Sequence, residues 1–561
     1  MDKKVKVKFN ILAIISIIIF CFAITPKTLQ NDTYYTIKIG EHILQEGIDM
    51  KDPFSWHENL PYTYPHWAYD VAVYQIYQIG ENTGIGGFTA IYISTVILTM
   101  ILGVLLYYAA NKICKNRLVA FLITLGVIYL LKSFIAARAQ LVTYILFVLQ
   151  ILFIEQFLTT KKKRYAVGLI ILPIIIANVH LAVWPFYFVL FLPYVVEYII
   201  AIIADSNWYY KLTIKWNKHR VKKLSLKDGK KEQIESITAK IDELQGKLEK
   251  FIIKREERRN NPYKIILKKE EAAKWLILIM VICAFTGLLT PLGDTPYTYL
   301  VKTMQGNTMD NINEHLPLTL INNKNILVVF ALFLAILIFT DTKISLRDLF
   351  MLSGLTLLSF MSRRQVSMFV LICGFILQKL IDRLVDKYDK EGCQQVIEGM
   401  TKFLGKTLTI LVVLLVSLYI YRPKIDDSIV NESTYPVAAC DYILENLDVS
   451  SIRIFNEYNY GSYLLYRGIP VFIDSRADLY TPEFNGTKGE DGKYKGRDIF
   501  TDYISTSNVS TYYENTFEAY HITHVIIRKS AKLNMFLSRD DKYKELYSDK
   551  YFVVYERMNQ Q

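Results

Sequence analysis

Apolar runs long enough to cross a bilayer recur along the first three quarters of this 561-residue chain. A hydrocarbon core about 30 Å thick is spanned by roughly 20 residues of helix, and only segments that satisfy their own backbone hydrogen bonds are stable inside it. So many runs predict a bundle of transmembrane helices rather than one soluble core. We place about eleven spans, at 9–25, 86–110, 118–134, 141–159, 165–179, 182–204, 274–290, 325–340, 347–361, 365–381 and 405–421.

The distribution of basic residues predicts the orientation of these spans, because short loops rich in Lys and Arg stay in the cytoplasm. Four lysines precede the first span, which we interpret as an uncleaved anchor with the N-terminus inside. The segment Lys211–Lys274 holds 20 Lys and Arg against 10 Asp and Glu, whereas the chain from Asp426 onward holds 15 against 21. We therefore predict a multi-pass protein of the plasma or inner membrane, with a cytoplasmic N-terminus and an extracytoplasmic C-terminal domain.

The predicted fold class is an α-helical polytopic membrane protein with a C-terminal extracytoplasmic α/β domain. The transmembrane domain covers 1–424 and includes a first outer loop at 26–85 and a basic cytoplasmic helical loop at 205–273. The domain at 425–561 alternates short β runs with helical stretches, which is typical of a small α/β unit. The predicted strands are 453–456, 470–474, 524–527 and 552–556, and the predicted helices are near 435–447 and 532–547.

The excess of cations in the basic loop raises the question of nucleic-acid binding. Within it, Glu232–Arg259 alternates charges and repeats apolar residues at spacings of three and four. That pattern is typical of a solvated amphipathic helix. We interpret it as one arm of a hairpin near the anionic inner leaflet, and we do not expect a nucleic-acid partner.

Polar residues that a membrane anchor does not need gather at the outer ends of the spans. Asp32 follows the first span by only a few residues, and ionisable groups placed close to a membrane are costly enough to favour a functional interpretation. The sequence contains no Walker loop, no Gly-rich dinucleotide turn and no HExxH motif. These absences disfavour an enzyme driven by a soluble nucleotide.

A series of short motifs is spread over most of the chain. In order, they are Asp32–Gly40, Asp52–Ser55, His66-Trp67, Ala137–Leu141, Ala177–His180, Thr290–Gly293, Ile312–Pro317, Ser362–Arg364, Phe455–Tyr463 and Phe472–Asp478. These motifs resemble those of bacterial C-type glycosyltransferases, which are polytopic enzymes that take a sugar from a polyprenyl-phosphate carrier. Ala139 stands where that family usually has Pro, and two other motifs depart in one or two residues.

The resemblance implies transfer of a sugar from a polyprenyl-phosphate donor to an envelope glycan, lipid or protein acceptor on the outer face of the membrane. Such chemistry needs a carboxylate that deprotonates or orients the acceptor, and cations that stabilise the departing phosphate. Asp32 is the first candidate base and Asp52 the second. The candidate phosphate ligands are the arginines at outer span ends, which are Arg138, Arg363 and Arg364.

Three further residues complete the candidate site implied by the resemblance. They either support the reaction or hold a divalent cation, for which the sequence offers no ligand spacing, so the metal stays unknown. These residues are His66, His180 and Glu314.

Each assignment has a plainer structural alternative. The arginines are able to snorkel to lipid headgroups, Asp52 precedes a proline and suits a turn, and His180 is able to hydrogen-bond across spans. In the C-terminal domain, Asp474, Arg476 and Asp478 are interpreted as an internal salt-bridge network in preference to an acceptor-binding patch.

Two functions of other classes stay open. A lipid-linked saccharide flippase would show charged residues inside spans and internal repeats, and neither is clear. A non-catalytic envelope assembly or sensor protein would use the C-terminal domain as a binding module. An enzyme requires the outer-loop acids and the span-end arginines to converge, whereas a sensor allows them to point apart.

Overall fold

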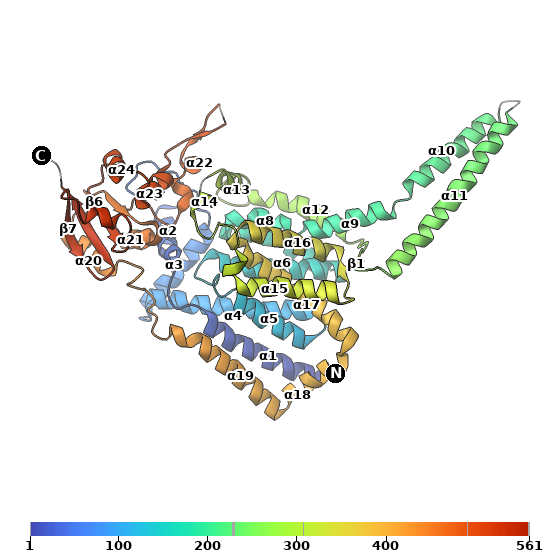
Figure 1. Ribbon diagram of the computed structural model, residues 1–561, viewed down its shortest axis with the longest axis horizontal. Coiled ribbons are helices and arrows are strands. Elements are labelled where there is room, and N and C mark those ends of the chain that lie inside the picture. The colour runs from blue at the N-terminus through green and yellow to red at the C-terminus, as the bar shows by residue number, and fades with distance from the viewer. Residues whose placement is uncertain (1, 227–229, 307, 491, 559–561) are drawn as a thin grey trace.

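The computed structural model describes residues 2–226, 230–306, 308–490 and 492–558. It consists of a bundle of apolar helices, a helical hairpin that projects from one end of the bundle, and a domain with a small sheet at the other end (Figure 1). We call these the hairpin end and the domain end. The N-terminus lies at the hairpin end.

Every predicted apolar run falls on helix. By length and composition, five stretches of the described chain are able to cross a membrane, and shorter apolar helices accompany them, so the prediction of a polytopic helical membrane protein is confirmed. The helices that carry the predicted runs are α1 (Lys3–Ile24), α4 (Gly87–Ile113), α5 (Arg117–Leu130), α6 (Ala139–Thr160), α7 (Lys163–Val179), α8 (Trp184–Val189), α9 (Leu192–Asp205), α12 (Ala273–Ala284), α15 (Lys324–Phe339), α16 (Leu346–Met361), α17 (Val366–Tyr388) and α19 (Phe403–Tyr421).

The helices of the bundle differ in how much of their apolar surface the protein covers. In α6, 72% of the apolar stretch is buried inside the protein, which places this helix at the centre of the bundle. In α19, only 11% of the apolar stretch is buried. The described contacts of α19 are mainly with α1 and with the short helix α18 (Lys390–Thr401) that precedes it. Apolar side chains that no protein covers are stable in a bilayer, so α19 is a peripheral, lipid-facing helix.

Ion pairs link three helices inside the bundle near its hairpin end. Lys379 Nζ lies 2.8 Å from both Glu155 and Asp348, and Arg347 lies 3.3 Å from Glu155. The cavity beside them measures about 10 Å³, which is about the space one water needs. These charges therefore neutralise one another and hold α6, α16 and α17 together.

The C-terminal domain is a four-stranded mixed sheet with short helices around it. The strand order is β3-β6-β8-β7, in which β3 pairs with β6 in parallel and the other pairs are antiparallel. The strands are β3 (Ile454–Asn456), β6 (His524–Arg528), β7 (Tyr543–Ser548) and β8 (Phe552–Arg557). The helices are α20 (Val437–Asn446), α21 (Tyr458–Tyr466), α22 (Pro482–Asn485), α23 (Ile499–Ser507), α24 (Tyr513–Ala519) and α25 (Asn534–Leu537).

Two predicted elements of this domain are wrong. The segment 470–474 is not a strand of the sheet, because its backbone instead makes a single bridge to the first outer loop, Ser55 with Val471. The predicted helix at 532–547 contains only α25 and then β7. Strand pairing with β8 decides the conformation of β7, and such tertiary pairing overrides local propensity.

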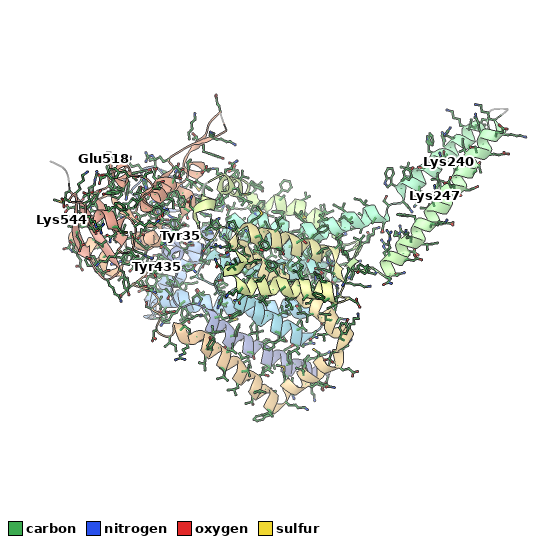
Figure 2. All side chains as sticks on the ribbon, in the orientation of Figure 1. Tyr35, Lys240, Lys247, Tyr435, Glu518 and Lys544 are labelled. Carbon is green, nitrogen blue, oxygen red and sulfur yellow. The ribbon has the colours of Figure 1, made fainter. Side chains whose placement is uncertain are left out.

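The first outer loop shares a hydrophobic core with the C-terminal domain, and the nearby ends of bundle helices join it through residues such as Ile91 of α4 and Ala139 of α6. The loop contains α2 (Asn31–Glu46) and α3 (Trp67–Asn82). Tyr34 of α2 is fully buried and makes edge-to-face contacts with Tyr435 and Tyr463, at centroid distances of 4.9 and 5.0 Å. Tyr35 and Tyr435 mark this junction in Figure 2. Because aromatic pairs contribute beyond their buried area, the domain is firmly attached to α2.

A buried arginine fixes the rest of the loop to the same domain. Arg476 Nη1 lies 2.7 Å from Asp52 Oδ1, its Nη2 lies 2.6 Å from Asp474 Oδ2, and the three side chains are at most 3% exposed. Trp56 Nε1 also donates to the carbonyl oxygen of Ile454, at 3.0 Å. The predicted network of Asp474 and Arg476 is therefore present, and it extends to Asp52.

The basic loop forms an antiparallel hairpin of α10 (Trp208–Leu224) and α11 (Lys231–Asn260). Ile214, Ile241 and Leu244 form its core. At its base, Arg255 Nη1 donates to the backbone carbonyl of Asp205 at 3.0 Å, and Arg259 pairs with the Asp205 carboxylate. These contacts hold the hairpin against the end of α9.

The remaining described elements are short connectors. They are α13 (Thr295–Gln305), α14 (Thr308–Asn311), α18 (Lys390–Thr401), the paired β1 (Ile265–Ile266) and β2 (Ile344–Ser345), the paired β4 (Thr487–Lys488) and β5 (Tyr494–Lys495), and the 3₁₀ turns η1 (Leu181–Val183), η2 (Thr286–Leu288), η3 (Leu320–Asn322), η4 (Arg363–Gln365), η5 (Arg422–Lys424) and η6 (Ala477–Tyr480).

Candidate functional site

Three charged residues from distant parts of the sequence meet at the domain end of the bundle. Arg138 Nη2 lies 2.6 Å from Asp32 Oδ2, and Arg138 Nη1 lies 3.2 Å from Glu314 Oε1. The side chains of Asp32 and Arg138 are 19% and 23% exposed, whereas that of Glu314 is 52% exposed. One guanidinium group therefore bridges two carboxylates in a partly covered position that solvent still reaches. We call these three residues the acid–arginine cluster.

Local structure explains why Asp32 and Arg138 face each other. Asp32 lies in the first turn of α2, where the helix dipole favours a carboxylate. Arg138 is the N-cap residue of α6 with extended backbone, and Thr33 Oγ1 donates to the carbonyl oxygen of Ala137 at 3.3 Å. Ala139 is the first residue of α6, a position that also accepts Pro. The departure from the family motif at Ala139 therefore leaves this geometry intact.

The loop that carries Glu314 is paired with the Arg-rich turn η4. The backbone N–H of Arg364 donates to the carbonyl of Glu314 at 2.9 Å, and that of Arg363 donates to the carbonyl of Leu316 at 3.0 Å. Ser362 Oγ also donates to the Glu314 carbonyl at 3.3 Å. Although Glu314 and Ser362 are 48 residues apart in the sequence, their two motifs therefore form one unit beside Arg138.

Two histidines predicted as supporting residues also meet here. The rings of His66 and His180 lie 4.9 Å apart, and His180 Nδ1 forms a 2.8 Å hydrogen bond with Thr143 Oγ1 of α6. Burial, followed by the charges of Arg364 and Arg138, lowers the pKa of His66 to about 3. Both cations thus lie near His66, which is neutral at physiological pH and is able to hydrogen-bond without adding positive charge. His180 has the cross-span hydrogen bond that its structural alternative predicted.

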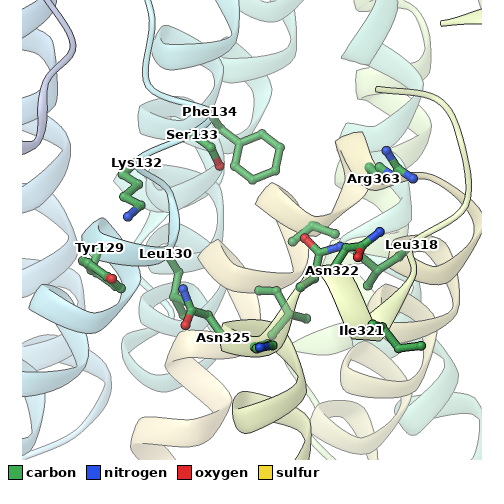
Figure 3. A pocket seen from close by; sticks show the side chains of 14 residues that line it. Tyr129, Leu130, Lys132, Ser133, Phe134, Leu318, Ile321, Asn322, Asn325 and Arg363 are labelled. Atoms are coloured by element: carbon green, nitrogen blue, oxygen red, sulfur yellow. The ribbon is translucent and has the colours of Figure 1, made fainter. Parts of the chain in front are cut away.

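Arg363 lines a cavity next to the acid–arginine cluster. The cavity has a volume of about 320 Å³ and is lined by the end of α5, the start of α15 and η4. Its charged lining residues are Lys132, Lys324 and Arg363, and no Asp or Glu is among the described residues that line it. Figure 3 shows Lys132 and Arg363 on opposite sides of this space. The N-terminus of α15 adds further positive potential, so the cavity suits an anion.

Asp52, the second candidate base, belongs to a different cluster from Asp32. Asp52 is not brought to Asp32; it is fully covered and is held by Arg476 and by backbone N–H groups of Phe54 and Ser55. Burial alone would raise the pKa of Asp52, but Arg476 and Ser55 hold it below its usual range. The bonds from Phe54 and Ser55 correspond to the turn that was the structural alternative for Asp52, whereas its ion pair with Arg476 was not predicted. Among the described residues, Asp52 has no contact with the acid–arginine cluster.

Asp478 belongs to the site, although the sequence placed it in the salt-bridge network. Tyr299 Oη of α13 donates to Asp478 Oδ2 at 2.5 Å. Burial raises the pKa of Asp478, opposed by this hydrogen bond and by the charge of Arg364. The C-terminal domain thus contributes a carboxyl group close to Arg364. Asp478 was part of a matching motif but was assigned to the salt-bridge network, and Lys132 and Lys324 carried no sequence signal. Only the tertiary fold brings these segments together.

Asp70 of α3 is a buried carboxyl group beside the junction with the C-terminal domain. It is fully buried, and neither carboxylate oxygen accepts a well-formed hydrogen bond among the described residues, although Thr36 lies beside it. Burial raises the pKa of Asp70 well above its usual range. In the folded protein this carboxyl group therefore keeps its proton to a higher pH than an exposed aspartate does.

We expect Asp70→Asn to stabilise the protein, increasingly so as the pH rises. Folding of the wild type takes up a proton at Asp70 above the unfolded pKa of about 4, which costs up to about 1.4 kcal/mol per pH unit until the folded pKa is reached. The amide has no such cost. Thermal unfolding of the purified protein at pH 5 and pH 8 checks this, with Asp541→Asn, at an exposed position, as the control. Parallel pH curves for wild type and Asp70→Asn would contradict the assignment.

The arrangement does not fit a divalent cation. Among the described residues, no three His, Cys, Asp or Glu side chains are grouped as a metal site. The two carboxylates that would hold a cation, Asp32 and Glu314, are already bridged by Arg138. The guanidinium group takes the position between the acids that a metal ion would need.

The chain is similar to known proteins in structure but matches none in sequence. The sequence matches no protein-family model, and no curated protein matches it significantly. The apo crystal structure of the Archaeoglobus fulgidus oligosaccharyltransferase aligns with a TM-score of 0.52 and 10% identity, over 93% of this chain and 69% of that chain. The archaeal oligosaccharyltransferase AglB from the same organism, in complex with an inhibitory peptide and a dolichol-phosphate, aligns with a TM-score of 0.51 and 13% identity, over 99% of this chain and 74% of that chain.

At these identities the likeness concerns the fold, and it extends over nearly the whole chain. Both the helical bundle and the C-terminal domain are included in it. The chain therefore shares the fold of these two oligosaccharyltransferase structures, and the resemblance first drawn from short motifs is confirmed for the fold.

Proposed function

We propose that this protein transfers a sugar from a polyprenyl-phosphate donor to an acceptor of the cell envelope, on the outer face of the membrane. The observation that carries the proposal is the convergence of Asp32, Arg138 and Glu314 beside a cavity with three cations. An enzyme requires the outer-loop acids and the span-end arginines to meet in one place, whereas a sensor does not. A fold shared with oligosaccharyltransferases supports the same conclusion.

The two halves of the proposed reaction are assigned to neighbouring spaces. The cavity lined by Lys132, Lys324 and Arg363 takes the donor phosphate, whose charge increases as the glycosyl bond breaks. Asp32 orients the acceptor group and accepts its proton. Arg138 holds the Asp32 carboxylate in place, and Arg364 adds positive charge between the two spaces. Arg363 lines the phosphate cavity, and Arg364 is the next residue, with its Cα atom about 3.8 Å away. The phosphate cavity and the acceptor space are therefore adjacent.

A flippase is the second candidate, because the bundle contains charged side chains between its helices. Those charges pair with one another around a cavity of about 10 Å³. A saccharide passage would need an open polar route. The paired charges therefore favour a structural role and leave the enzyme as the better supported function.

Comparative mass spectrometry of the cell envelope tests the proposed function. Cells that lack the protein are expected to lose a sugar from one class of glycan, lipid or protein, and to accumulate the corresponding polyprenyl-phosphate sugar. The wild-type gene should restore both. A flippase defect would instead leave the donor on the cytoplasmic side, where added membrane-impermeant glycosidase cannot reach it in intact spheroplasts. Unchanged glycans and unchanged carrier lipids would contradict both candidates.

We expect sugar transfer by the wild type to be insensitive to metal chelators. We also expect Arg138→Lys to lower the rate of transfer about 100-fold. Lys is a point charge that does not bridge two carboxylates in the way a planar guanidinium does, and small misplacements of catalytic groups cost this much. Isolated membranes with their endogenous substrates, assayed with and without EDTA, provide the measurement. Loss of wild-type transfer on chelation, with recovery on adding Mg²⁺ or Mn²⁺, would contradict the role of Arg138.

We expect the double variant Lys324→Gln with Arg363→Gln to purify with at least about tenfold less polyprenyl phosphate than the wild type, because charge-assisted contacts to phosphate are lost. Native mass spectrometry of the purified protein measures the bound lipid. Lys302→Gln with Lys406→Gln removes the same charge away from the cavity and serves as control. Equal retention by all three proteins would exclude the cavity as the phosphate site.

A further inference from the structure

Helix α10 has two apolar faces, and only one of them has a partner. Tyr210, Ile214 and Val221 pack against α11. On the opposite side, Trp208, Leu212 and Trp216 are spaced by four residues, so they form a single stripe. They are 63%, 55% and 59% exposed, and no described residue covers the stripe.

The cations of the hairpin are concentrated on the same helix. α10 contains six Lys and Arg and no Asp or Glu, whereas α11 contains eight Lys and Arg against seven Asp and Glu. Lys215, Lys222 and Lys223 are exposed on the same side of α10 as the stripe, and the guanidinium of Arg220 lies 4.8 Å from the ring centroid of Trp216. An apolar stripe flanked by cations is the pattern of a helix that lies in a membrane interface.

The position of the stripe in the fold agrees with this pattern. α9 ends at Asp205, and the stripe begins three residues later at Trp208, in the half of α10 next to the bundle. The contacts of Arg255 and Arg259 with Asp205 fix the angle at this joint. Figure 1 shows the hairpin leaving the bundle obliquely, with α10 and α11 along its two edges, and Figure 2 marks Lys240 and Lys247 on it. Trp residues at the end of a span prefer the headgroup level.

We propose that α10 binds the anionic phospholipid headgroups of the leaflet at the hairpin end, which is the cytoplasmic leaflet in the predicted topology. Trp208, Leu212 and Trp216 insert between the headgroups, and the flanking lysines pair with their phosphates. The sequence had predicted the membrane-near helix at Glu232–Arg259, which is α11. The structure assigns this contact to α10 and leaves α11, with its balanced charges, facing solvent.

Hydrogen–deuterium exchange of the full-length protein in nanodiscs tests the proposal. The discs contain phosphatidylcholine alone or with 30% phosphatidylglycerol. We expect amides of α10 to exchange at least about fivefold more slowly in the anionic discs, while those of α11 change little, because each cation near such a surface adds to binding. Raising the salt from 0.1 to 0.5 M should reduce the difference. Equal exchange of α10 in both discs would overturn the proposal.

Matched variants separate lipid binding from other causes. K215E/K222E/K223E should abolish the effect of phosphatidylglycerol, and W208S/W216S should weaken it, whereas K240E/K250E/K254E makes the same charge change on exposed positions of α11 and should leave it intact. Protection of α10 that is the same in both lipids and accompanies a doubled particle mass would indicate a second copy of the chain on the stripe. That result, or an effect that survives K215E/K222E/K223E, would refute the assignment.

Discussion

Asp32→Asn is expected to abolish sugar transfer, with a loss of about 100- to 10,000-fold, the range for removal of a general base. Asn has nearly the same shape as Asp and still accepts a hydrogen bond from Arg138, so the fold should be preserved. It cannot take up the acceptor's proton. The measurement is the envelope sugar, quantified by mass spectrometry in cells whose only copy of the protein carries the substitution.

The control for Asp32→Asn is Glu46→Gln, an exposed acid at the other end of the same helix. It should leave the envelope sugar at the wild-type level. Protein abundance and insertion are compared by immunoblotting of membranes. A normal sugar level with Asp32→Asn, at normal abundance of the variant, would rule out Asp32 as the base.

Arg476→Met is expected to destabilise the C-terminal domain by about 3–5 kcal/mol, because it leaves two carboxylates buried without a counter-ion. Asp52 and Asp474 are both fully covered around Arg476. Loss of this contact should also release the first outer loop and expose the chain near Trp56 to protease. Thermal unfolding and limited proteolysis of the purified protein measure the two effects.

Two further variants test whether uncompensated charge causes this loss of stability. Arg476→Met combined with Asp52→Asn should recover part of the lost stability, because one of the stranded charges is gone. Arg467→Met removes an arginine from a surface pair in the same domain, with Asp441 52% exposed, and should cost less than about 1 kcal/mol. Equal destabilisation by Arg467→Met and Arg476→Met would show that burial of the pair is irrelevant.

Much of the architecture could be predicted because membrane spans depend on local composition. Each apolar run fell on helix, and the Arg-rich turn at Ser362–Arg364 joins α16 to α17 as expected. The C-terminal domain was harder, since β7 acquires its conformation from pairing with β8. Glu155 was hidden in a nearly continuous apolar run, and only the fold shows that Lys379 and Arg347 neutralise it.

The candidate site could be predicted in part. Asp32, Arg138 and Glu314 were chosen from separate motifs, and the structure brings all three together. What the sequence could not supply was their mutual geometry, in which Arg138 bridges the two carboxylates. The environments of two other aspartates were equally hidden in the sequence. Asp52 is paired with Arg476, and Asp478 accepts a hydrogen bond from Tyr299, and in each pair the partners lie far apart in the sequence.

The attachment of the first outer loop to the C-terminal domain has a consequence for biosynthesis. Asn31 donates a side-chain hydrogen bond to the carbonyl of Tyr458, 427 residues later. At 5–20 residues per second, the ribosome needs about 20 to 85 s to complete the partner of α2 after α2 itself has emerged. During that interval Tyr34 and its apolar neighbours lack their packing surface, so the nascent chain depends on the bilayer interface or on a chaperone to protect them.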